Sequence, residues 1–390
     1  MKHTVFTVSI LFLTFLLIGS ATFLVSPLIG AIASSLHVAT AAGGLLVSSY
    51  AFSYVVFTFA LAPVSDRVER RLLLVIGMLL FAAGLLMSAL SANMPLMLAA
   101  RAVTGIGAAI VSPAVWSYIG DVVTPEQSRR ITAIVASALS LGLIVGVPAG
   151  SWLAKFSGWR TCFAYMAGIA FAVTIGLLFL QRTALADVHR AKGGWYDLFP
   201  GNYCMCYGTS FLINFSLFGL YTYLGYDLEH TFHISSAQSF GPFMLAGCGN
   251  LAGVLIAGRL PAVKPPKKQL SLLAFFLAAT FLMIPLAHRH LIIYLIVTVG
   301  WMGAGGALFA AIQSLVPRLS QMHRGAVVAV NNGFMWSGTA AGSATFGPVV
   351  SYFGFSAAAL VCFIMTLFAA LLLTRFRLGA AAQPLRRGRE

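Results

Sequence analysis

Long apolar runs separated by short polar clusters make up almost the whole chain. Each run extends over about twenty residues, the length that an α-helix needs to cross the hydrocarbon core of a bilayer. None shows the alternation of apolar and polar residues that marks a strand of a membrane barrel. The pattern therefore predicts an all-α membrane protein with twelve transmembrane helices. The expected spans are 5–32, 42–62, 72–91, 95–120, 131–153, 161–181, 202–226, 237–258, 269–287, 291–316, 325–350 and 356–376.

The basic residues in the polar clusters indicate how these helices are oriented. Twelve crossings place both termini on one side, and the loops then alternate between the two sides. Of the 24 Lys and Arg residues, only Lys155, Arg160 and Arg289 fall on the second side, Arg101 lies within a span, and the other twenty fall on the side of the termini. Because basic residues accumulate on the cytoplasmic side, we expect both termini to be cytoplasmic and the protein to lie in the plasma (inner) membrane.

Composition agrees with a membrane protein and argues against other classes. Charged residues make up 8% of the chain and hydrophobic residues 59%, which leaves too few charges for the surface of a soluble domain. The formal net charge of +15 would suit a nucleic-acid-binding protein, but helix orientation explains the basic clusters, so we expect no nucleic-acid partner. The five cysteines follow no metal-ligand spacing, and no set of nucleophile and base emerges. We expect no metal, no cofactor and no enzymatic activity.

The two halves of the chain repeat each other. The pattern Gly142-x3-Gly146-x-Pro148 returns as Gly338-x3-Gly342 followed by Gly347-Pro348, and Ser157-Gly158-Trp159 returns as Phe353-Gly354-Phe355. The offset is 196 residues both from Gly142 to Gly338 and from Trp159 to Phe355. An offset of half the chain indicates a parallel duplication of the kind found in one class of secondary transporters. We expect an N-terminal six-helix bundle at 1–181, a cytoplasmic linker at 182–201, a C-terminal six-helix bundle at 202–376 and a cytoplasmic tail at 377–390.

Three motifs resemble those of the major facilitator superfamily. The stretch Ala62-Pro63-Val64-Ser65-Asp66-Arg67-Val68-Glu69-Arg70-Arg71 is similar to the family's loop 2–3 motif G-x-L-x-D-R-x-G-R-R, with Ala62 and Glu69 in place of glycines. Arg101-x2-Thr104-Gly105-x-Gly107 resembles the helix 4 motif R-x-x-Q-G-x-G, and Gly142-x3-Gly146-Val147-Pro148-x-Gly150 resembles the helix 5 antiporter motif G-x3-G-P-x2-G. The resemblance implies the major facilitator fold, two pseudo-symmetric six-helix bundles, and the twelve-helix drug:proton antiporter branch, which includes multidrug, sugar and purine exporters.

The loop after the second span is expected to take part in gating. Asp66 can cap the N-terminus of a neighbouring helix, and we expect this to be the span that begins at 325. Arg67 or Arg70 can pair with Asp121 at the cytoplasmic end of the fourth span. Such contacts between the halves would hold the cytoplasmic side shut in one state and release it in the other. The alternative is that these charges only orient the helices.

Small residues on the fifth span are expected to contribute to the same gating. Gly142, Gly146, Pro148 and Gly150 form a narrow, kinked helix face that a partner helix can approach closely. The eleventh span carries the mirrored set. We therefore expect the fifth span to pack on the eighth, and the eleventh on the second.

Arg101 and the acidic residues are the candidates for coupling. A buried guanidinium costs several kcal/mol unless it is paired or hydrated, so we expect Arg101 to face a central cavity and act in substrate or proton coupling; the alternative is that its head reaches the interface. None of the nine acidic residues lies in the middle of a span. The nearest candidates for a proton carrier are Asp227 and Glu229 at the outer end of the seventh span, with His230 and His233 nearby.

Polar and aromatic side chains within otherwise apolar spans are the candidates for substrate contact. An unpaired amide in hydrocarbon is costly, whereas an aromatic ring there is often ordinary packing. These candidates are Tyr50, Tyr54, Trp116, Asn214, Tyr221, Gln313, Asn331, Asn332 and Trp336. With no central carboxylate, a strongly cationic compound would lack a counter-charge, which favours a neutral, amphipathic or anionic substrate.

The sequence thus predicts a secondary active transporter that works as a monomer in the lipid bilayer. We expect it to export a small organic molecule (drug-like, sugar or nucleobase type) by alternating access, coupled to the inward flow of protons. Two alternatives remain open. One is a facilitator or importer of a polar or anionic solute with Arg101 as the anion site, and the other is a membrane receptor that transports nothing.

Overall fold

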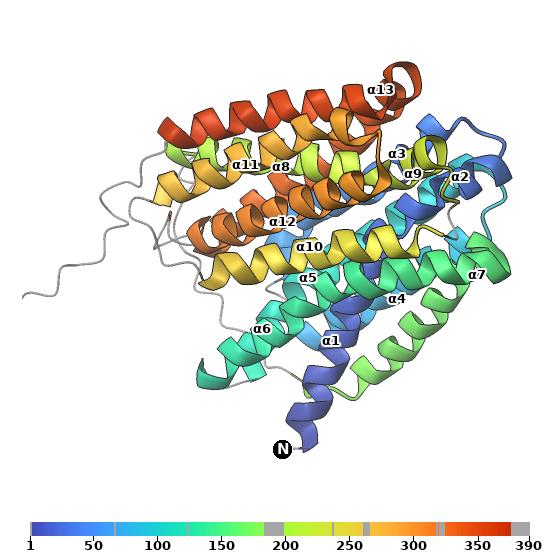
Figure 1. Ribbon diagram of the computed structural model, residues 1–390. Helices are drawn as coiled ribbons and strands as arrows, with labels where there is room; N and C mark the ends of the chain where they lie inside the picture. The colour runs from blue at the N-terminus through green and yellow to red at the C-terminus, as the bar shows by residue number, and fades with distance from the viewer. Residues whose placement is uncertain are drawn as a thin grey trace, which may run out of the picture.

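The computed structural model describes residues 2–65, 68–122, 125–182, 199–235, 238–259, 266–316, 319 and 324–375, and in these ranges all regular secondary structure is helical (Figure 1). The first bundle, formed by the N-terminal half of the chain, consists of α1 (Lys2–Phe23), α2 (Val25–Ser35), η1 (Thr40–Gly43), α3 (Gly44–Ser65), α4 (Arg70–Ala89), α5 (Met94–Val122), α6 (Pro125–Leu141), η2 (Gly142–Gly146) and α7 (Val147–Leu178). The second bundle consists of α8 (Gly201–Thr222), α9 (Leu224–Phe232), α10 (Phe240–Arg259), α11 (Pro266–Ala287), α12 (Leu291–Leu315) and α13 (Arg324–Arg375).

The described helices account for the twelve expected crossings. Ten of them are long and apolar enough to span a membrane, and two of these ten, Ile134–Leu178 and Val327–Arg375, have 45 and 49 residues, enough for two crossings each. Each long helix breaks at one glycine, Gly158 (φ 76°) in the first and Gly354 (φ 81°) in the second. Only glycine adopts this backbone conformation readily. The two breaks are 196 residues apart, the offset of the sequence repeat, and the prediction of twelve transmembrane helices is confirmed.

Two of the expected spans are interrupted near one end. The span predicted at 5–32 consists of α1 and α2, which separate at Leu24, and the span predicted at 202–226 consists of α8 and α9, which separate at Tyr223 and reach Phe232. Pro27 explains part of the first break, because it has no N–H to donate to the carbonyl of Phe23. The two breaks occupy corresponding places in the two halves, so they belong to the repeated architecture.

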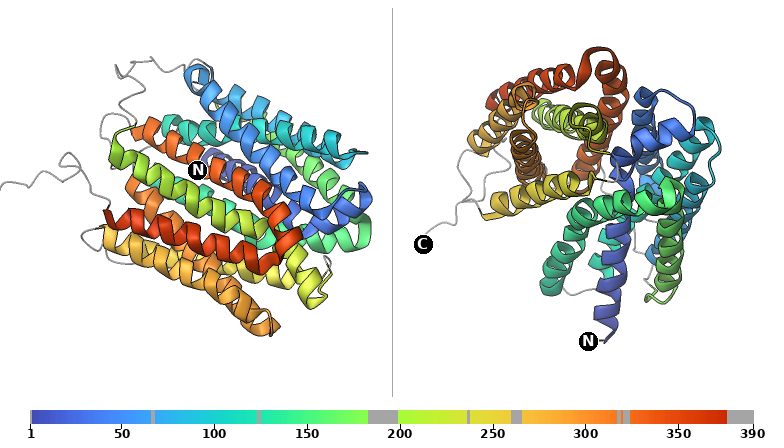
Figure 2. Two further views of the ribbon diagram at one scale, coloured as in Figure 1. Left: turned by 90° about the horizontal axis from the view of Figure 1, so that it is seen from above. Right: turned by 45° about the vertical axis from the view of Figure 1, so that its right-hand side comes forward.

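The two bundles have the same internal packing, and Figure 2 shows the blue-to-green half beside the yellow-to-red half. In the first bundle α1 packs on α6 and η2, α3 on α5, and α4 on α5 and α7. In the second bundle α8 packs on α13, α10 on α12, and α11 on α12 and α13. Each contact in one list has its counterpart in the other, so the pseudo-symmetric arrangement of two six-helix bundles is confirmed.

The bundles contact each other in three regions. α3 and the preceding η1 lie against α13, α10 lies against α6, η2 and α7, and α2 contacts α8 and α9. The expected pairs, fifth span with eighth and eleventh with second, are therefore present. Large apolar side chains such as Phe179, Leu272 and Ile292 are exposed on the outside, each by more than 70%. Such a surface fits a hydrocarbon environment.

Candidate functional site

Aromatic side chains from both bundles meet where α3 lies against α13. The ring centroid of Tyr54 on α3 is 4.9 Å from that of Trp336 on α13, and the Tyr50 centroid is 5.8 Å from the same indole. Both tyrosines are buried. These three candidates from the sequence therefore come together, and the cluster that they form bridges the two halves.

A second aromatic cluster joins α1 to the second bundle. Phe23 stacks on Phe218 at 4.5 Å between ring centroids and meets Tyr221 edge-on at 5.5 Å, and Tyr221 in turn meets Phe243 of α10. Tyr221 is fully buried, and its hydroxyl has no hydrogen-bond partner among the described residues. The candidate Trp116 takes part in neither cluster, since it packs on Phe15 within the first bundle and is partly exposed.

Arg101 lies in the interior of the first bundle. Its side chain is fully buried and does not extend to an interface. The guanidinium donates through Nε to the carbonyl of Leu46 (3.3 Å), through Nη1 to that of Ala21 (3.1 Å) and through Nη2 to that of Thr22 (3.4 Å). It also lies over the ring of Tyr50, with Cζ 4.9 Å from the centroid. Arg101 thus ties α5 to α1 and α3, and all three of its nitrogens are used there.

The amide candidates are bonded mainly within the second bundle. Ser210 donates to the carbonyl oxygen of the Asn331 side chain (2.7 Å), and Asn214 donates to the backbone carbonyl of Ser210 (2.8 Å). Gln313 of α12 donates to Asn332 of α13 at 3.2 Å. Because the partners come from α8, α12 and α13, these amides hold the second bundle together next to the aromatic cluster on α13.

Asp227 is the centre of a buried polar cluster at the start of α9. Its Oδ2 accepts a hydrogen bond from the Tyr294 hydroxyl (2.6 Å) and lies 3.0 Å from Nε2 of His288, and its Oδ1 accepts from Thr231 (2.9 Å). Nδ1 of His288 lies 2.9 Å from Oγ of Ser356. We call these five residues the Asp227 cluster.

The sequence singled out Asp227 but not the histidine that contacts it. His230 and His233, like Glu229, are exposed, and the histidine that contacts Asp227 is His288. This residue follows α11, 61 positions further along the chain. The signal that could have indicated it is the polar group His288-Arg289-His290 between two apolar runs. Such a group reads as an ordinary loop unless the tertiary contact is known.

The gating candidates of the loop after α3 are only partly described. Asp66 and Arg67 lie outside the described residues, as does the expected cap that Asp66 would form. The expected pair of Arg70 with Asp121 is present, with Nε 3.6 Å from Oδ2. It joins α4 to α5, however, so the expectation that this pair connects the two halves was wrong: both helices belong to the first bundle and pack side by side.

The glycine face of the fifth span has a different partner from the one implied by the sequence. A Cβ on Gly142 would lie 2.7 Å from the backbone nitrogen of Ser20, and one on Gly146 would overlap the Ser20 hydroxyl. Gly150 likewise faces Leu24. This face, which continues through Pro148 into α7, therefore packs on α1 of its own bundle. Toward the eighth span, by contrast, Ile144 lies against Gly247 of α10, and α6 and α7 contact α10 as well.

Hydrogen bonds connect the bundles at the end opposite the termini. Ser26 of α2 donates to the carbonyls of Tyr221 and Thr222, the latter at 3.0 Å. The Tyr223 hydroxyl donates to the carbonyl of Ala41 (3.1 Å), and Ser48 of α3 donates to that of Ala340 on α13 (2.7 Å). Ser26 and Thr222 are 196 residues apart, so equivalent positions of the repeat touch each other. The two halves are in direct contact at this end.

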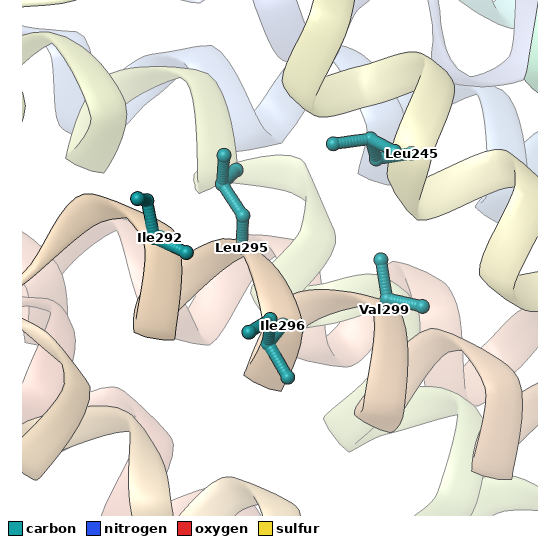
Figure 3. A pocket seen from close by; sticks show the side chains of 5 residues that line it. All are labelled: Leu245, Ile292, Leu295, Ile296 and Val299. Atoms are coloured by element: carbon teal, nitrogen blue, oxygen red, sulfur yellow. The ribbon is translucent and has the colours of Figure 1, made fainter.

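An apolar groove of about 300 Å³ lies elsewhere, on the outside of the second bundle (Figure 3). It is lined by Leu245 of α10 and by Ile292, Leu295, Ile296 and Val299 of α12. With no polar side chain to orient a solute, this groove fits hydrocarbon chains of the bilayer and is separate from the polar and aromatic side chains between the halves.

Two bundles with the same packing, joined along helices that carry aromatic and polar side chains, define a duplicated, twelve-helix membrane transporter. The chain belongs to the Major Facilitator Superfamily, whose family model matches residues 11–303. Members of this family are transporters and not enzymes.

Similar proteins include transporters of bacteria. The MFS-type transporter YceJ of Bacillus subtilis (strain 168) is 25% identical over 337 residues, which cover 85% of each chain. Multidrug resistance protein 2 of the same organism is 26% identical over 250 residues, which cover 62% of this chain and 60% of that one. Among solved structures, the D-xylose-proton symporter matches with a TM-score of 0.80 at 17% identity, over 96% of this chain and 98% of that chain. At this identity the structural match supports the fold alone.

Proposed function

We propose that the protein exports a small organic molecule by alternating access, in exchange for protons, from the cytoplasm across the plasma (inner) membrane. The family supplies the transport mechanism, and the multidrug resistance relative favours export. The basic residues on the side of the termini favour cytoplasmic termini. The end at which Ser26 and Tyr223 connect the bundles is then the outer end.

The observation that carries this proposal is the contact of Tyr50 and Tyr54 with Trp336. A substrate can shift the balance between two states only if it interacts differently with them. In a transporter of two rocking bundles, such a difference arises where side chains of both bundles can touch the same molecule. Tyr54 and Trp336 meet this condition, since α3 and α13 belong to different bundles and the rings are 4.9 Å apart.

The chemistry of these side chains favours an uncharged, amphipathic, ring-containing substrate of the drug, sugar or nucleobase type. Tyrosine and indole rings stack on planar or apolar faces, and the amides of Asn331, Asn332 and Gln313 lie on neighbouring turns of α12 and α13. The nitrogens of Arg101 donate to backbone carbonyls. This arrangement disfavours the alternative in which Arg101 is the anion site of an importer.

A ligand screen followed by a transport assay tests the proposal. Purified protein is screened by thermal shift against drugs, sugars, nucleobases and amino acids, and each stabilising compound is offered to everted membrane vesicles. We expect uptake that requires an acidic vesicle lumen, because protons must leave the lumen as the compound enters it, and that stops when an ionophore collapses the proton gradient. A Trp336→Ala variant should bind the compound about tenfold more weakly, because it loses ring contacts of about 0.5–1.5 kcal/mol each, whereas Trp336→Phe should retain most of the affinity.

The other outcomes separate the alternatives. A facilitator would equilibrate the compound in the vesicles whether or not the gradient is present. A protein that binds a compound but moves none in proteoliposomes would be a receptor, and either result would overturn proton-driven export.

The proposed gating role of the loop after α3 rests on its resemblance to the family motif. Asp66 and Arg67 are proposed to act there as a charge latch, with Arg70 and Asp121 supporting the loop from within the first bundle. An Asp66→Asn variant that is expressed normally should transport slowly. Transport at the wild-type rate would exclude the latch and leave these charges as an orientation signal.

A further inference from the structure

The Asp227 cluster is unusual because it buries an acid without a fixed counter-charge. Among the acidic side chains that the structure describes, Asp227 is the buried one, whereas Asp121 and Glu229 are exposed and Glu69 is half-buried. It contacts no Lys or Arg within salt-bridge distance in the described chain, and its one titratable cationic partner is His288. Burying an isolated carboxylate is costly, so its charge must be offset by hydrogen bonds or by a proton.

The hydrogen bonds of the cluster are compatible with two protonation states. When His288 carries one proton on Nε2, it donates to Asp227, and Nδ1 accepts from the Ser356 hydroxyl. When His288 carries two protons, Nδ1 donates to the same hydroxyl, because a serine oxygen can donate or accept. Tyr294 and Thr231 donate to the carboxylate in both cases. The cluster can therefore take up or release one proton without losing a hydrogen bond.

The two protonation states differ in charge. With the extra proton the pair of Asp227 and His288 is neutral overall, and without it the buried cluster carries one negative charge. The proton can enter from the outer end, since the side chain of His288 is 19% exposed while that of Asp227 is only 4% exposed.

α9 connects this cluster to the contact between the bundles. The helix is nine residues long and separated from α8 by the break at Tyr223. One side carries Asp227, and another carries Gly225, where a Cβ would lie 2.7 Å from the carbonyl of Ser26 on α2. Glu229 likewise approaches Gly30 of α2, so a charge change in the cluster acts on a short segment that also touches the other bundle.

We propose that Asp227 and His288 together form a proton-binding site whose occupancy controls the contact of α9 with α2, and hence the opening of the outer end. This inference rests on the proposed proton-coupled export and names the site at which the proton binds. Only N–H and O–H bonds change, and the proton is exchanged with water at the outer end. Other titratable or charged groups on α9 and on the segments around it are Tyr223, Tyr226, Glu229, His230, His233, His37, Arg289, His290 and Tyr294.

Proton binding can be tested without a substrate. Infrared difference spectra of the reconstituted protein are recorded as the pH is changed between about 5 and 9, a range that covers histidine and perturbed carboxyl groups. We expect one step in which carboxyl and imidazole bands change together, and we expect Asp227→Asn and His288→Gln each to remove it. The matched control is Glu229→Gln on the same helix, which should retain the step. A step that survives in both cluster variants would overturn the proposal.

A milder variant covers the case in which these substitutions impair folding. Tyr294→Phe removes one donor to the carboxylate, which the negatively charged, deprotonated cluster needs more than the neutral pair of Asp227 and His288 does. The titration midpoint of the variant should therefore rise, because the deprotonated state is destabilised more than the protonated one. An unchanged midpoint in a folded Tyr294→Phe protein would count against the site.

Transport measurements separate this inference from the proposed function. With a compound found in the screen, Asp227→Asn should still exchange labelled for unlabelled compound across the membrane but should no longer accumulate it against a gradient when protons are supplied. If the wild type shows no proton-driven accumulation, the proposed antiport itself fails. If the wild type and Asp227→Asn both accumulate the compound, antiport stands and this proton site is wrong.

Discussion

At the scale of single residues, Arg101 is a buried cationic side chain that links three helices of the first bundle. Its three hydrogen bonds, to the carbonyls of Ala21, Thr22 and Leu46, hold α5 against the end of α1 and against α3. An Arg101→Met variant keeps the apolar stem and loses every donor. We expect it to lose about 1.5–3 kcal/mol of stability for each charged hydrogen bond not replaced by water, and to lose proton-driven export. Thermal unfolding in detergent and vesicle transport measure the two effects.

The control for this prediction is Lys155→Met. Lys155 is exposed on α7 and far from the proposed proton site in the chain, so the same change in charge should leave both the unfolding temperature and transport close to the wild type. If Arg101→Met is as stable and as active as this control, the hydrogen bonds of Arg101 to the carbonyls contribute neither to stability nor to transport.

At this scale the sequence identified two important ionisable side chains but not the groups that they contact. Arg101 and Asp227 stood out because an ionisable group in an apolar stretch needs a compensating environment. Their partners are backbone carbonyls of α1 and α3 in one case and His288, 61 residues away, in the other. Neither is visible in a local pattern, since both depend on which helices lie side by side in the fold.

At the scale of helices, the glycines of the fifth span set how closely α6 and η2 approach α1. In Gly142→Ala the new methyl group would lie 2.7 Å from the backbone nitrogen of Ser20 and 2.8 Å from the carbonyl oxygen of Leu16. Backbone atoms cannot move aside as a side chain can, so we expect overpacking to cost about 1–3 kcal/mol and to slow transport. The unfolding temperature and the transport rate of the variant check this.

Gly168→Ala on α7 is the matched control, because no other side chain or distant backbone lies within 4 Å of the added methyl group there. It should be neutral or slightly stabilising, as alanine favours a helix more than glycine does. Equal stability of the two variants would mean that α1 and α6 are not in the close contact described.

The membrane spans could be predicted from the sequence because the length of an apolar run is a local property. The positions at which the helices break could not be predicted in this way. Gly158 and Gly354 were noted as parts of a repeat, yet their positive φ and the resulting helix breaks follow from the turn between antiparallel helices. The glycines of the fifth span were expected to face the eighth span, but they face α1. The sequence could not identify this partner, because a face of small residues shows that a helix packs closely there but not which helix it is.

At the scale of the whole molecule, the distribution of basic residues predicts how the transporter is oriented in the membrane. Twenty basic residues on the side of the termini against three on the other should place both termini in the cytoplasm. A membrane-impermeant thiol reagent applied to right-side-out cells should label Ser34→Cys, which is exposed at the outer end, and should not label a cysteine added at the C-terminus. The reverse labelling pattern would invert the orientation and turn the proposed export into import.

Alternating access further requires the outer ends of the bundles to separate during each cycle. Ser48 of α3 and Ala340 of α13 lie in different bundles, with the Ser48 hydroxyl 2.7 Å from the Ala340 carbonyl. With the five native cysteines replaced, Ser48→Cys and Ala340→Cys joined by a short thiol cross-linker should stop transport, and cleaving the link should restore it. The matched control joins Thr222→Cys to Ser343→Cys, whose native hydroxyls are 2.9 Å apart within the second bundle. Because helices of one bundle move together, this second link should leave transport intact. If both links block transport equally, rearrangement within a bundle is required, and if neither does, the outer contact does not need to open.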